Sequence, residues 1–277
     1  MKTTPLVSII IPTKNSAKTL LACITSIKRQ TYSNIEYIVV DNYSLDATQD
    51  IAKNNKARLM ITGNERSAQR NAGANHAHGE FLLFIDSDME LLPEVVDECV
   101  NIMQEHKNIQ AIVIPEDSFG TTLWAACKNF ERSTYANSSW LHGARFFRSS
   151  AFTSISGFQE DIIGAEDFDI HTRTVNAFGL SGIGYSSIAI RHNEGALTLT
   201  HLLKKKYYYG STLKAYANNQ RNKHMLYKQA NPITRIQLFF QNPTFLFQHP
   251  IIFTATCIMK TLEFCALGLG YLMKSAV

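Results

Sequence analysis

Two aspartates separated by one small residue follow a strongly apolar run in FLLFIDSDMELLP, residues 81–93. Such a run predicts a buried strand of a parallel sheet that is covered on both faces. Two carboxylates at its end cost repulsion and desolvation unless positive charge lies beside them. Asp86 and Asp88 therefore indicate a divalent-cation site, with one simpler alternative, in which Asp88 caps the helix that Pro93 introduces.

Polar residues also end the other strand-like segments. Thr13 follows the apolar run VSIIIP, and Asp41 ends IEYIVVD. Because open α/β sheets bind ligands outside the carboxyl ends of their strands, we expect these side chains to lie at one ligand-binding edge. A capped turn is the alternative for Asp41, since DNYSLDAT is rich in turn-forming residues, and Asp46 is expected to cap the helix that follows.

Strand-like and helix-like segments alternate over the first 115 residues. This βαβα order predicts an α/β fold with a doubly wound, mostly parallel sheet. The glycine-rich fingerprint of dinucleotide binding is missing after the first strand, which argues against an NAD-type cofactor. The expected strands are residues 6–12, 35–41, 57–62, 80–86 and 109–115, and the expected helices are 16–30, 44–55, 67–77 and 92–106.

A second acidic pair lies in the less regular region between residues 116 and 200. The stretch AEDFDIHTRTVNAFG predicts a helix that starts near Glu166, with Glu166 and Asp167 at its positive end. One of these carboxylates could act as a general base, and the alternative is a pair of charges that only stabilises the helix start. His192, in IRHNEG, could be a metal ligand, although a lone histidine is usually structural or solvated.

Cysteine usage and the N-terminus favour a cytoplasmic setting. The five cysteines are scattered without C-x-x-C spacing, which predicts reduced, packed thiols rather than a disulfide framework or a zinc site. The apolar run near the N-terminus is short and is broken by Pro12, so we expect no signal peptide.

Charge is distributed unevenly along the chain. Residues 201–277 contain ten Lys and Arg but a single acid, Glu263, whereas residues 1–200 contain more acids than bases. A basic tail favours an anionic partner. Its aliphatic and aromatic content beside Lys204, Lys205 and Lys206 favours an anionic membrane surface over nucleic acid.

The last apolar segment, residues 251–273, is long enough to cross a bilayer as a helix of about 34 Å. Lys260 and Glu263 near its middle would be costly there, but their spacing of three puts them on one face. We therefore expect helices that lie in the membrane interface rather than a full span. A soluble helical subdomain or an oligomer interface is the alternative.

Five motifs occur in the order and spacing of family 2 glycosyltransferases with the GT-A fold, and over residues 1–195 the chain resembles that family. The motifs are VSIIIPTKN, IVVDNYSLDAT, RNAG, FIDSDM and GAEDFDI. The resemblance implies a GT-A, Rossmann-like fold and an inverting transfer of sugar from a nucleotide-diphosphate donor. The Q-x-x-R-W motif of the family's processive polymer synthases is missing, which favours transfer of a single sugar.

The resemblance also implies roles for individual residues. Asp88 would bind Mg²⁺ or Mn²⁺ directly, and His192 would be a further ligand. Asp86 would hold the ribose or a metal-bound water. Asp167 would be the general base, and Glu166 would bind the acceptor or orient the loop. Asp41 would contact the nucleotide base. The full set implied to bind the nucleotide sugar is Pro12, Thr13, Asn15, Asp41, Arg66, Arg70, Asp86 and Ser87.

Arg66 and Arg70 lie on one helix face by their spacing of four and could reach the donor phosphates or base. The alternative is an exposed basic face.

We expect a glycosyltransferase domain at residues 1–197, with a nucleotide-sugar half at 1–115 and an acceptor half at 116–197. Residues 198–277 would form an amphipathic, helical membrane-association region. The acceptor would be a saccharide, in particular a lipid-linked one, at the cytoplasmic face of a membrane, with the protein peripheral or monotopic. Two alternatives remain: a polyprenyl-phosphate sugar synthase, whose phosphate acceptor needs no base, and a catalytically silent scaffold. The sequence leaves the oligomeric state open.

Overall fold

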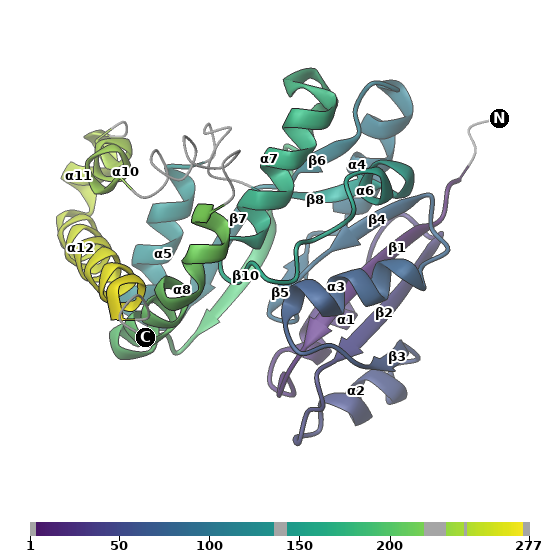
Figure 1. The fold of residues 1–277 in the computed structure, drawn as a ribbon, viewed down its shortest axis with the longest axis horizontal. Helices are drawn as coiled ribbons and strands as arrows, with labels where there is room; N and C mark the ends of the chain where they lie inside the picture. The colour runs from purple at the N-terminus through teal and green to yellow at the C-terminus, as the bar shows by residue number, and fades with distance from the viewer. Residues whose placement is uncertain (1–3, 136–142, 219–230, 241–242, 274–277) are drawn as a thin grey trace. The chain divides into compact units, whose positions relative to one another are not determined.

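The computed structural model describes residues 4–135, 143–218, 231–240 and 243–273, and it divides into two compact units (Figure 1). The first comprises Met1–Pro115, Gly143–Glu160 and Ile170–His192, and the second comprises Glu116–His142, Asp161–Asp169 and Asn193–Val277. One unit boundary lies after Pro115, and the expected division at residue 197 stays a prediction. Residues 116–135 belong with the C-terminal helices because α5 (Leu123–Ser133) packs against α12 (Pro250–Met273).

The first unit is built on a mostly parallel sheet, as the sequence predicts. Among the described residues its seven strands are in the order β3-β2-β1-β4-β8-β6-β9. The neighbours β3, β2, β1 and β4 are parallel, β6 and β9 are parallel, and β8 is antiparallel to both β4 and β6. The strands are β1 Val7–Thr13, β2 Ile35–Asp41, β3 Arg58–Ile61, β4 Phe81–Phe84, β6 Ala111–Val113, β8 Ala144–Arg148 and β9 Ile183–Tyr185.

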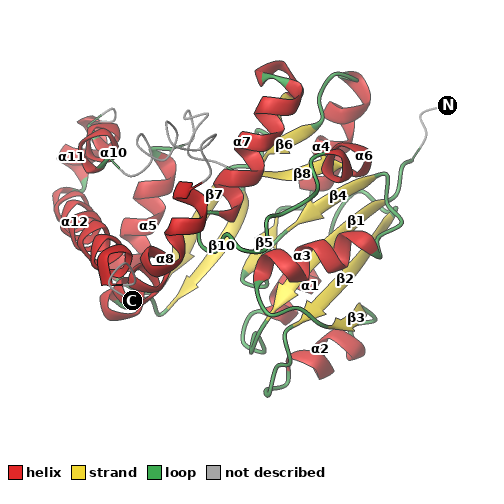
Figure 2. Ribbon diagram, in the orientation of Figure 1, coloured by secondary structure: helices red, strands yellow, loops and turns green. Residues whose placement is uncertain are grey.

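Both faces of this sheet are buried, which explains the near-continuous apolar runs. In β1, Ile9 and Ile11 join one core cluster and Ile10 joins the other, and Leu83 and Phe84 of β4 divide in the same way. Residues of α1 and α4 belong to the first cluster, and residues of α3, α6 and α7 to the second. Figure 2 shows these helices around the sheet. They are α1 Leu20–Lys28, α2 Thr48–Asn54, α3 Arg66–Asn75, α4 Val95–Glu105, α6 Ser149–Ser154 and α7 Glu166–Phe178.

A second, smaller sheet has the strand order β5-β10-β7. Its members are β5 (Met89–Leu91), β10 (Ile190–Gly195) and β7 (Glu116–Gly120). In the first unit β10 runs antiparallel to β5, with His192 opposite Met89.

The second unit is mainly helical. The first turn of α7 and the helices α5, α8 (Leu199–Asn218), α10 (Pro232–Phe239), α11 (Pro243–Gln248) and α12 belong to it. The helices α8 and α12 cross at two glycines: a Cβ added to Gly210 would lie 2.0 Å from the carbonyl oxygen of Leu267, and one added to Gly270 would lie 2.0 Å from that of Tyr207. The two backbones therefore touch.

The face of α12 that carries Lys260 and Glu263 is buried inside the second unit, and an apolar face remains exposed. The exposed side chains follow a spacing of three and four residues: Ile258, Leu262, Cys265, Leu269 and Leu272. Among the described helices, α12 alone is long and apolar enough to cross a membrane by length and composition. The prediction that one face carries both charges is therefore confirmed. The expected membrane contact stays a prediction, and part of the basic tail, residues 219–230 and 274–277, lies outside the described residues.

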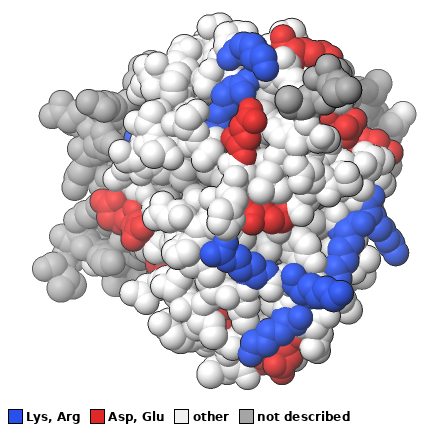
Figure 3. Space-filling model, turned by 90° about the vertical axis from the view of Figure 1, so that its right-hand side faces the viewer, with Lys and Arg blue, Asp and Glu red and all other residues white. Residues whose placement is uncertain are grey.

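One face of the molecule carries basic and acidic side chains interspersed among uncharged residues (Figure 3).

Candidate functional site

Asp41 is held in place by the strand pairing at the edge of the sheet. The β1–β2 register puts Thr13 opposite Asp41, and the Thr13 hydroxyl donates to Asp41 Oδ1 at 3.0 Å. The other oxygen, Oδ2, accepts from the Ser44 backbone N–H at 2.8 Å and from Gln49 Nε2 at 2.9 Å, and the Ser44 hydroxyl also donates to Oδ1. Because an ionised carboxylate has about four acceptor positions, a nucleotide base would have to replace one of these donors.

The loop after β1 is tied to the loop after β2. Asn15 adopts a left-handed conformation with φ of 51°, its backbone N–H donates to Ser44 Oγ at 2.7 Å, and its side-chain oxygen accepts from the Leu45 N–H at 2.9 Å. Pro12 lies inside β1, opposite Val40. Pro12 and Thr13 therefore end one strand and Asn15 shapes the loop after it, and their part in binding a nucleotide sugar stays a prediction.

Arg70 supplies the positive charge that the two aspartates require. Its side chain is 0% exposed, and its Nη2 lies 2.8 Å from Asp86 Oδ1. Burial alone would raise the pKa of Asp86, but the guanidinium of Arg70, followed by Arg145, Arg66 and His192, lowers it well below its ordinary value. Asp86 is therefore ionised, and the alternative in which Arg70 belongs to an exposed basic face is wrong.

Asp88 and His192 come together because β5 pairs with β10. His192 lies opposite Met89, the residue after Asp88, and its Nε2 is 3.4 Å from Asp88 Oδ2. The other carboxylate oxygen, Asp88 Oδ1, is buried and has no hydrogen-bond partner among the described residues. The adjacent Ser87 hydroxyl donates to Ser16 Oγ at 2.8 Å, which fixes the turn between β4 and β5.

The helix-cap alternative for Asp88 does not hold. Strand β5 follows Asp88 directly, and α4 begins only at Val95, with Glu94 at its cap position. The buried, unpartnered oxygen of Asp88 and the neighbouring imidazole instead fit two donors to a hard divalent cation. The described residues contain no group of three or more His, Cys, Asp or Glu that could hold a metal. Mg²⁺ and similar ions commonly bind through one or two carboxylates together with substrate phosphates and water, so a sparse protein contribution fits that chemistry.

The acidic pair of the predicted acceptor side begins α7 in the second unit. Glu166 is buried, Asp167 is half-buried, and both lie in the first helical turn. Just before them Gly164 has φ of 79°, and a Cβ there would come within 2.4 Å of the Tyr209 ring. This close approach explains the glycine of GAED. The acceptor-side residues thus belong to the second unit and the donor-side residues to the first, so the roles of Asp167 and Glu166 stay predictions.

Two further residues near the donor edge were missed from the sequence. Buried Gln69 donates through Nε2 to the backbone oxygens of Thr13 and Val40, at 2.9 and 2.6 Å, and so fixes the ends of β1 and β2. Arg145 is a buried cation that acts on Asp86. Its signal in the sequence is an arginine beside two phenylalanines in the short strand ARFFR; Gln69 carries no comparable signal.

Comparison with known proteins identifies the family. The family model "Glycosyl transferase family 2" matches residues 8–158. The chain is 30% identical over 178 residues to a PGL/p-HBAD biosynthesis glycosyltransferase of Mycobacterium bovis (strain BCG / Pasteur 1173P2), covering 61% of this chain and 69% of that protein. It is 32% identical over 107 residues to the glycosyltransferase GlyG of Streptococcus pneumoniae serotype 4, covering 36% of each.

Coverage limits what these relatives imply. The chain spans only 29%, 36% and 27% of the length of three relatives that it matches, so their whole-protein activities do not transfer to it directly.

A solved structure similar to this one is the mannosyltransferase PcManGT from Pyrobaculum calidifontis in complex with GDP-Man and Mn²⁺. The TM-score is 0.70 at 15% identity, over 98% of this chain and 88% of that one. At this identity the likeness shows the fold alone, which is GT-A, as the sequence motifs imply.

Proposed function

Because the chain belongs to glycosyl transferase family 2, we propose that it moves a single sugar from a nucleotide-diphosphate sugar to an acceptor hydroxyl, with inversion. The observation that carries the proposal is the arrangement after β4. Asp88 has a buried oxygen without a partner and lies beside His192, while Arg70 keeps Asp86 ionised. An arrangement of this kind suits a diphosphate bound through a divalent cation. The similar mannosyltransferase was solved with GDP-Man and Mn²⁺.

On the donor side, Asp88 and His192 would hold Mg²⁺ or Mn²⁺. When bound, the cation neutralises negative charge on the departing nucleotide diphosphate. Asp86, anchored on Arg70, would orient the ribose or a metal-bound water. The edge around Thr13, Asn15 and Asp41 would receive the nucleoside, with one donor of Asp41 replaced by the base.

On the acceptor side, Asp167 would remove the proton of the attacking hydroxyl. An inverting displacement needs one such base, placed so that the nucleophile attacks opposite the leaving group. Glu166 is buried one position earlier and would bind the acceptor or orient the loop that carries Asp167.

The alternatives differ in what they require of these acids. A polyprenyl-phosphate sugar synthase would attack with a phosphate oxygen and would not need Asp167 as a base. A silent scaffold would need neither Asp88 nor Asp167. The ion pair of Asp86 with Arg70 and the buried Asp88 Oδ1, which has no hydrogen-bond partner among the described residues, support an enzyme over a scaffold, because a scaffold needs neither feature.

We further propose that the second unit docks at the cytoplasmic face of an anionic membrane and that the acceptor is lipid-linked. The exposed apolar face of α12 and the exposed Lys204 and Lys205 of α8 support this proposal. Apolar burial and cationic attraction to anionic lipid act together in interfacial helices.

Turnover of the donor by an Asp88→Ala variant tests the metal assignment. Release of nucleotide diphosphate in the presence of Mn²⁺ should fall roughly 10²–10³-fold, the size found when a charge-stabilising contact is removed. Glu94→Ala is the matched control, because Glu94 is an exposed acid six residues later and makes no side-chain cap bond. Full activity of Asp88→Ala, or of the wild type in excess EDTA, would refute the assignment.

A further inference from the structure

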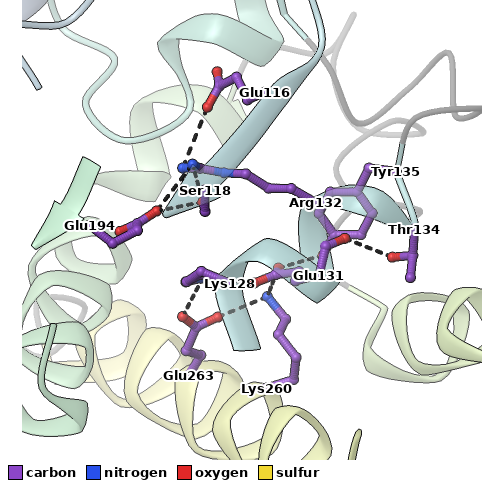
Figure 4. Close-up of polar contacts among 10 residues, drawn as sticks. All are labelled: Glu116, Ser118, Lys128, Glu131, Arg132, Thr134, Tyr135, Glu194, Lys260 and Glu263. Carbon is purple, nitrogen blue, oxygen red and sulfur yellow. Dashed lines mark hydrogen bonds and ion pairs between the residues drawn. The ribbon is translucent and has the colours of Figure 1, made fainter. Parts of the chain in front are cut away.

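Four buried charged residues form a closed ring in the second unit (Figure 4). Lys128 of α5 lies 2.8 Å from Glu131 and 2.8 Å from Glu263 of α12. Lys260 of α12 lies 2.6 Å from Glu131 and 2.8 Å from Glu263. Each cation therefore contacts both anions, and the ring is neutral. Burial alone would raise the pKa of Glu263, but Lys128, Lys260 and the more distant Lys206 lower it to about 2, so its carboxylate is ionised at neutral pH.

Two further cations, Lys206 of α8 and Arg235 of α10, lie outside this neutral ring. Arg235 stacks over the ring of Tyr135 at 4.6 Å, and its Nε and Nη1 are buried without a hydrogen-bond partner among the described residues. No hydrogen bond or ion pair links Lys206 to another residue in the part of the chain that the structure describes. Burial lowers the pKa of Lys206 to about 8; Glu263 and Glu131 oppose this shift, and Lys128 and Lys260 add to it.

The sequence offers no acid to neutralise these two cations from their own region. From residue 198 to residue 277 the single acidic side chain is Glu263, which the ring already engages. Lys206 and Arg235 are half-buried, so water solvates their charges only in part. With these two cations the cluster carries four positive charges and two negative ones, and this excess of positive charge at one place favours an anion.

That position is a cavity. It has a volume of about 90 Å³, and Lys206, Arg235, Lys260 and Glu263 line it. A single water molecule needs roughly 10–15 Å³ by this measure, so the cavity has room for a group as large as phosphate. The rest of the wall is largely apolar, with Phe168, Leu213 and Phe264 among its residues.

The cavity also adjoins the acidic start of α7. Gly164, Ala165 and Phe168 line it, and they flank Glu166 and Asp167 on both sides in the chain. A ligand group held there would therefore lie beside the residues that the proposed function assigns to the acceptor.

We propose that this cavity binds the phosphate group of an anionic acceptor, with Lys206 and Arg235 as its cationic partners. The inference rests on the proposed function, because it names the substrate class of the acceptor side. The hydroxyl of a diphosphate-linked saccharide and the phosphate of a polyprenyl phosphate are both compatible with it. The ring of Lys128, Glu131, Lys260 and Glu263 holds α5 and α12 in place around the ligand.

Calorimetric titration of the full chain with two probes, inorganic phosphate and farnesyl phosphate, tests the proposal. The wild type should bind both saturably at pH 7, and Lys206→Met and Arg235→Gln should each weaken binding at least about tenfold, the loss expected for one charge-assisted hydrogen bond. Lys53→Met is the control, since Lys53 is an exposed lysine of α2 that lines neither the cavity nor the proposed docking surface. Tighter binding of farnesyl phosphate than of phosphate would identify a lipid as the source, and equal binding would identify a soluble phosphate ester. Unchanged affinity in Lys206→Met, or no saturable binding of either probe by the wild type, would overturn the proposal.

Thermal melting shows whether a variant that no longer binds phosphate has lost only the binding site or has unfolded. Without an anion, Lys206→Met should melt at or above the wild-type temperature at pH 7, because it removes an uncompensated cation from the interior. Phosphate should raise the melting temperature of the wild type more than that of the variant. If Lys206→Met unfolds, Lys206→Arg replaces it, and this variant should keep phosphate binding because it keeps the charge.

Nucleotide binding separates this inference from the proposed function. Binding of nucleotide diphosphate with Mn²⁺ should be unchanged in Lys206→Met. A chain that binds the nucleotide but neither phosphate probe would refute the cavity proposal alone. A chain that binds phosphate through Lys206 but no nucleotide sugar would refute the transferase proposal alone.

Discussion

For single residues, the role of each charged group at the site after β4 depends on the side chains that surround it. Asp86 is ionised because a fully buried Arg70 contacts it, and Asp88 is distinguished by an oxygen that has no hydrogen-bond partner in the part of the chain that the structure describes. The sequence predicted both aspartates, because a D-x-D pair after an apolar strand is a local pattern. It could not predict that Arg145 acts on Asp86 or that Gln69 fixes the ends of β1 and β2, because those contacts depend on how distant strands and helices pack.

Substitution of Asp167 by Asn tests the base assignment. The amide keeps the shape of the side chain but cannot accept the proton, so the transfer rate should fall roughly 10²–10⁴-fold while the Kd of the donor stays the same. Asp161→Asn is the control, because Asp161 is an exposed acid six residues earlier. Near-normal turnover of Asp167→Asn would identify a phosphate acceptor instead, and loss of donor affinity would move Asp167 to the nucleotide site.

For helices and strands, the spacing and the number of apolar residues predicted the elements of the first unit well. Strands β1 and β2 were predicted to within a residue of each end, and α7 begins at Glu166 as expected. The role of α12 was harder to predict. Its charged pair suggested a polar face turned away from lipid, whereas Lys260 and Glu263 are buried against Lys128 and Glu131 of α5. The ion pairs between α5 and α12 join residues more than 120 positions apart, and no local sequence pattern predicts such a contact.

The crossing of α8 and α12 depends on glycine at the point of contact. Gly270→Ala should lower the free energy of unfolding by about 1–3 kcal/mol, because the new methyl group would push against the backbone of Tyr207. Gly268→Ala on the same helix is the matched control. No atom lies within 4 Å of its added Cβ, so it should be neutral or stabilising by up to about 1 kcal/mol through helix propensity. Denaturant unfolding measures both, and equal stability of the two variants would contradict the close crossing.

At the scale of the whole chain, basic charge and apolar surface are concentrated towards the C-terminus. The sequence predicted this asymmetry from composition alone. It did not predict that Lys206 lines a cavity while Lys204 and Lys205 are exposed, because neighbouring residues in a helix point in different directions.

Flotation with liposomes tests membrane docking. The full chain should float with anionic vesicles, and Leu262→Ser with Leu269→Ser should reduce flotation at all salt concentrations, because both side chains belong to the exposed apolar face. Lys204→Glu with Lys205→Glu should reduce it mainly at low ionic strength. Substitution of the exposed Thr254 and Thr261 by Ser is the control. A wild-type chain that stays in solution at low salt would refute docking.

We propose that this chain binds a nucleotide-diphosphate sugar through a divalent cation. The most direct measurement is a thermal-shift screen of the full chain against UDP-, GDP- and dTDP-sugars, with Mn²⁺ and with EDTA. At a hundredfold excess over Kd a ligand stabilises the fold by about 2.7 kcal/mol, a shift of several degrees for a chain of this size. We predict such a shift with at least one donor in Mn²⁺, its loss in EDTA, and its loss in Asp88→Ala. No shift with any of the donors, or an equal shift in EDTA, would contradict the account.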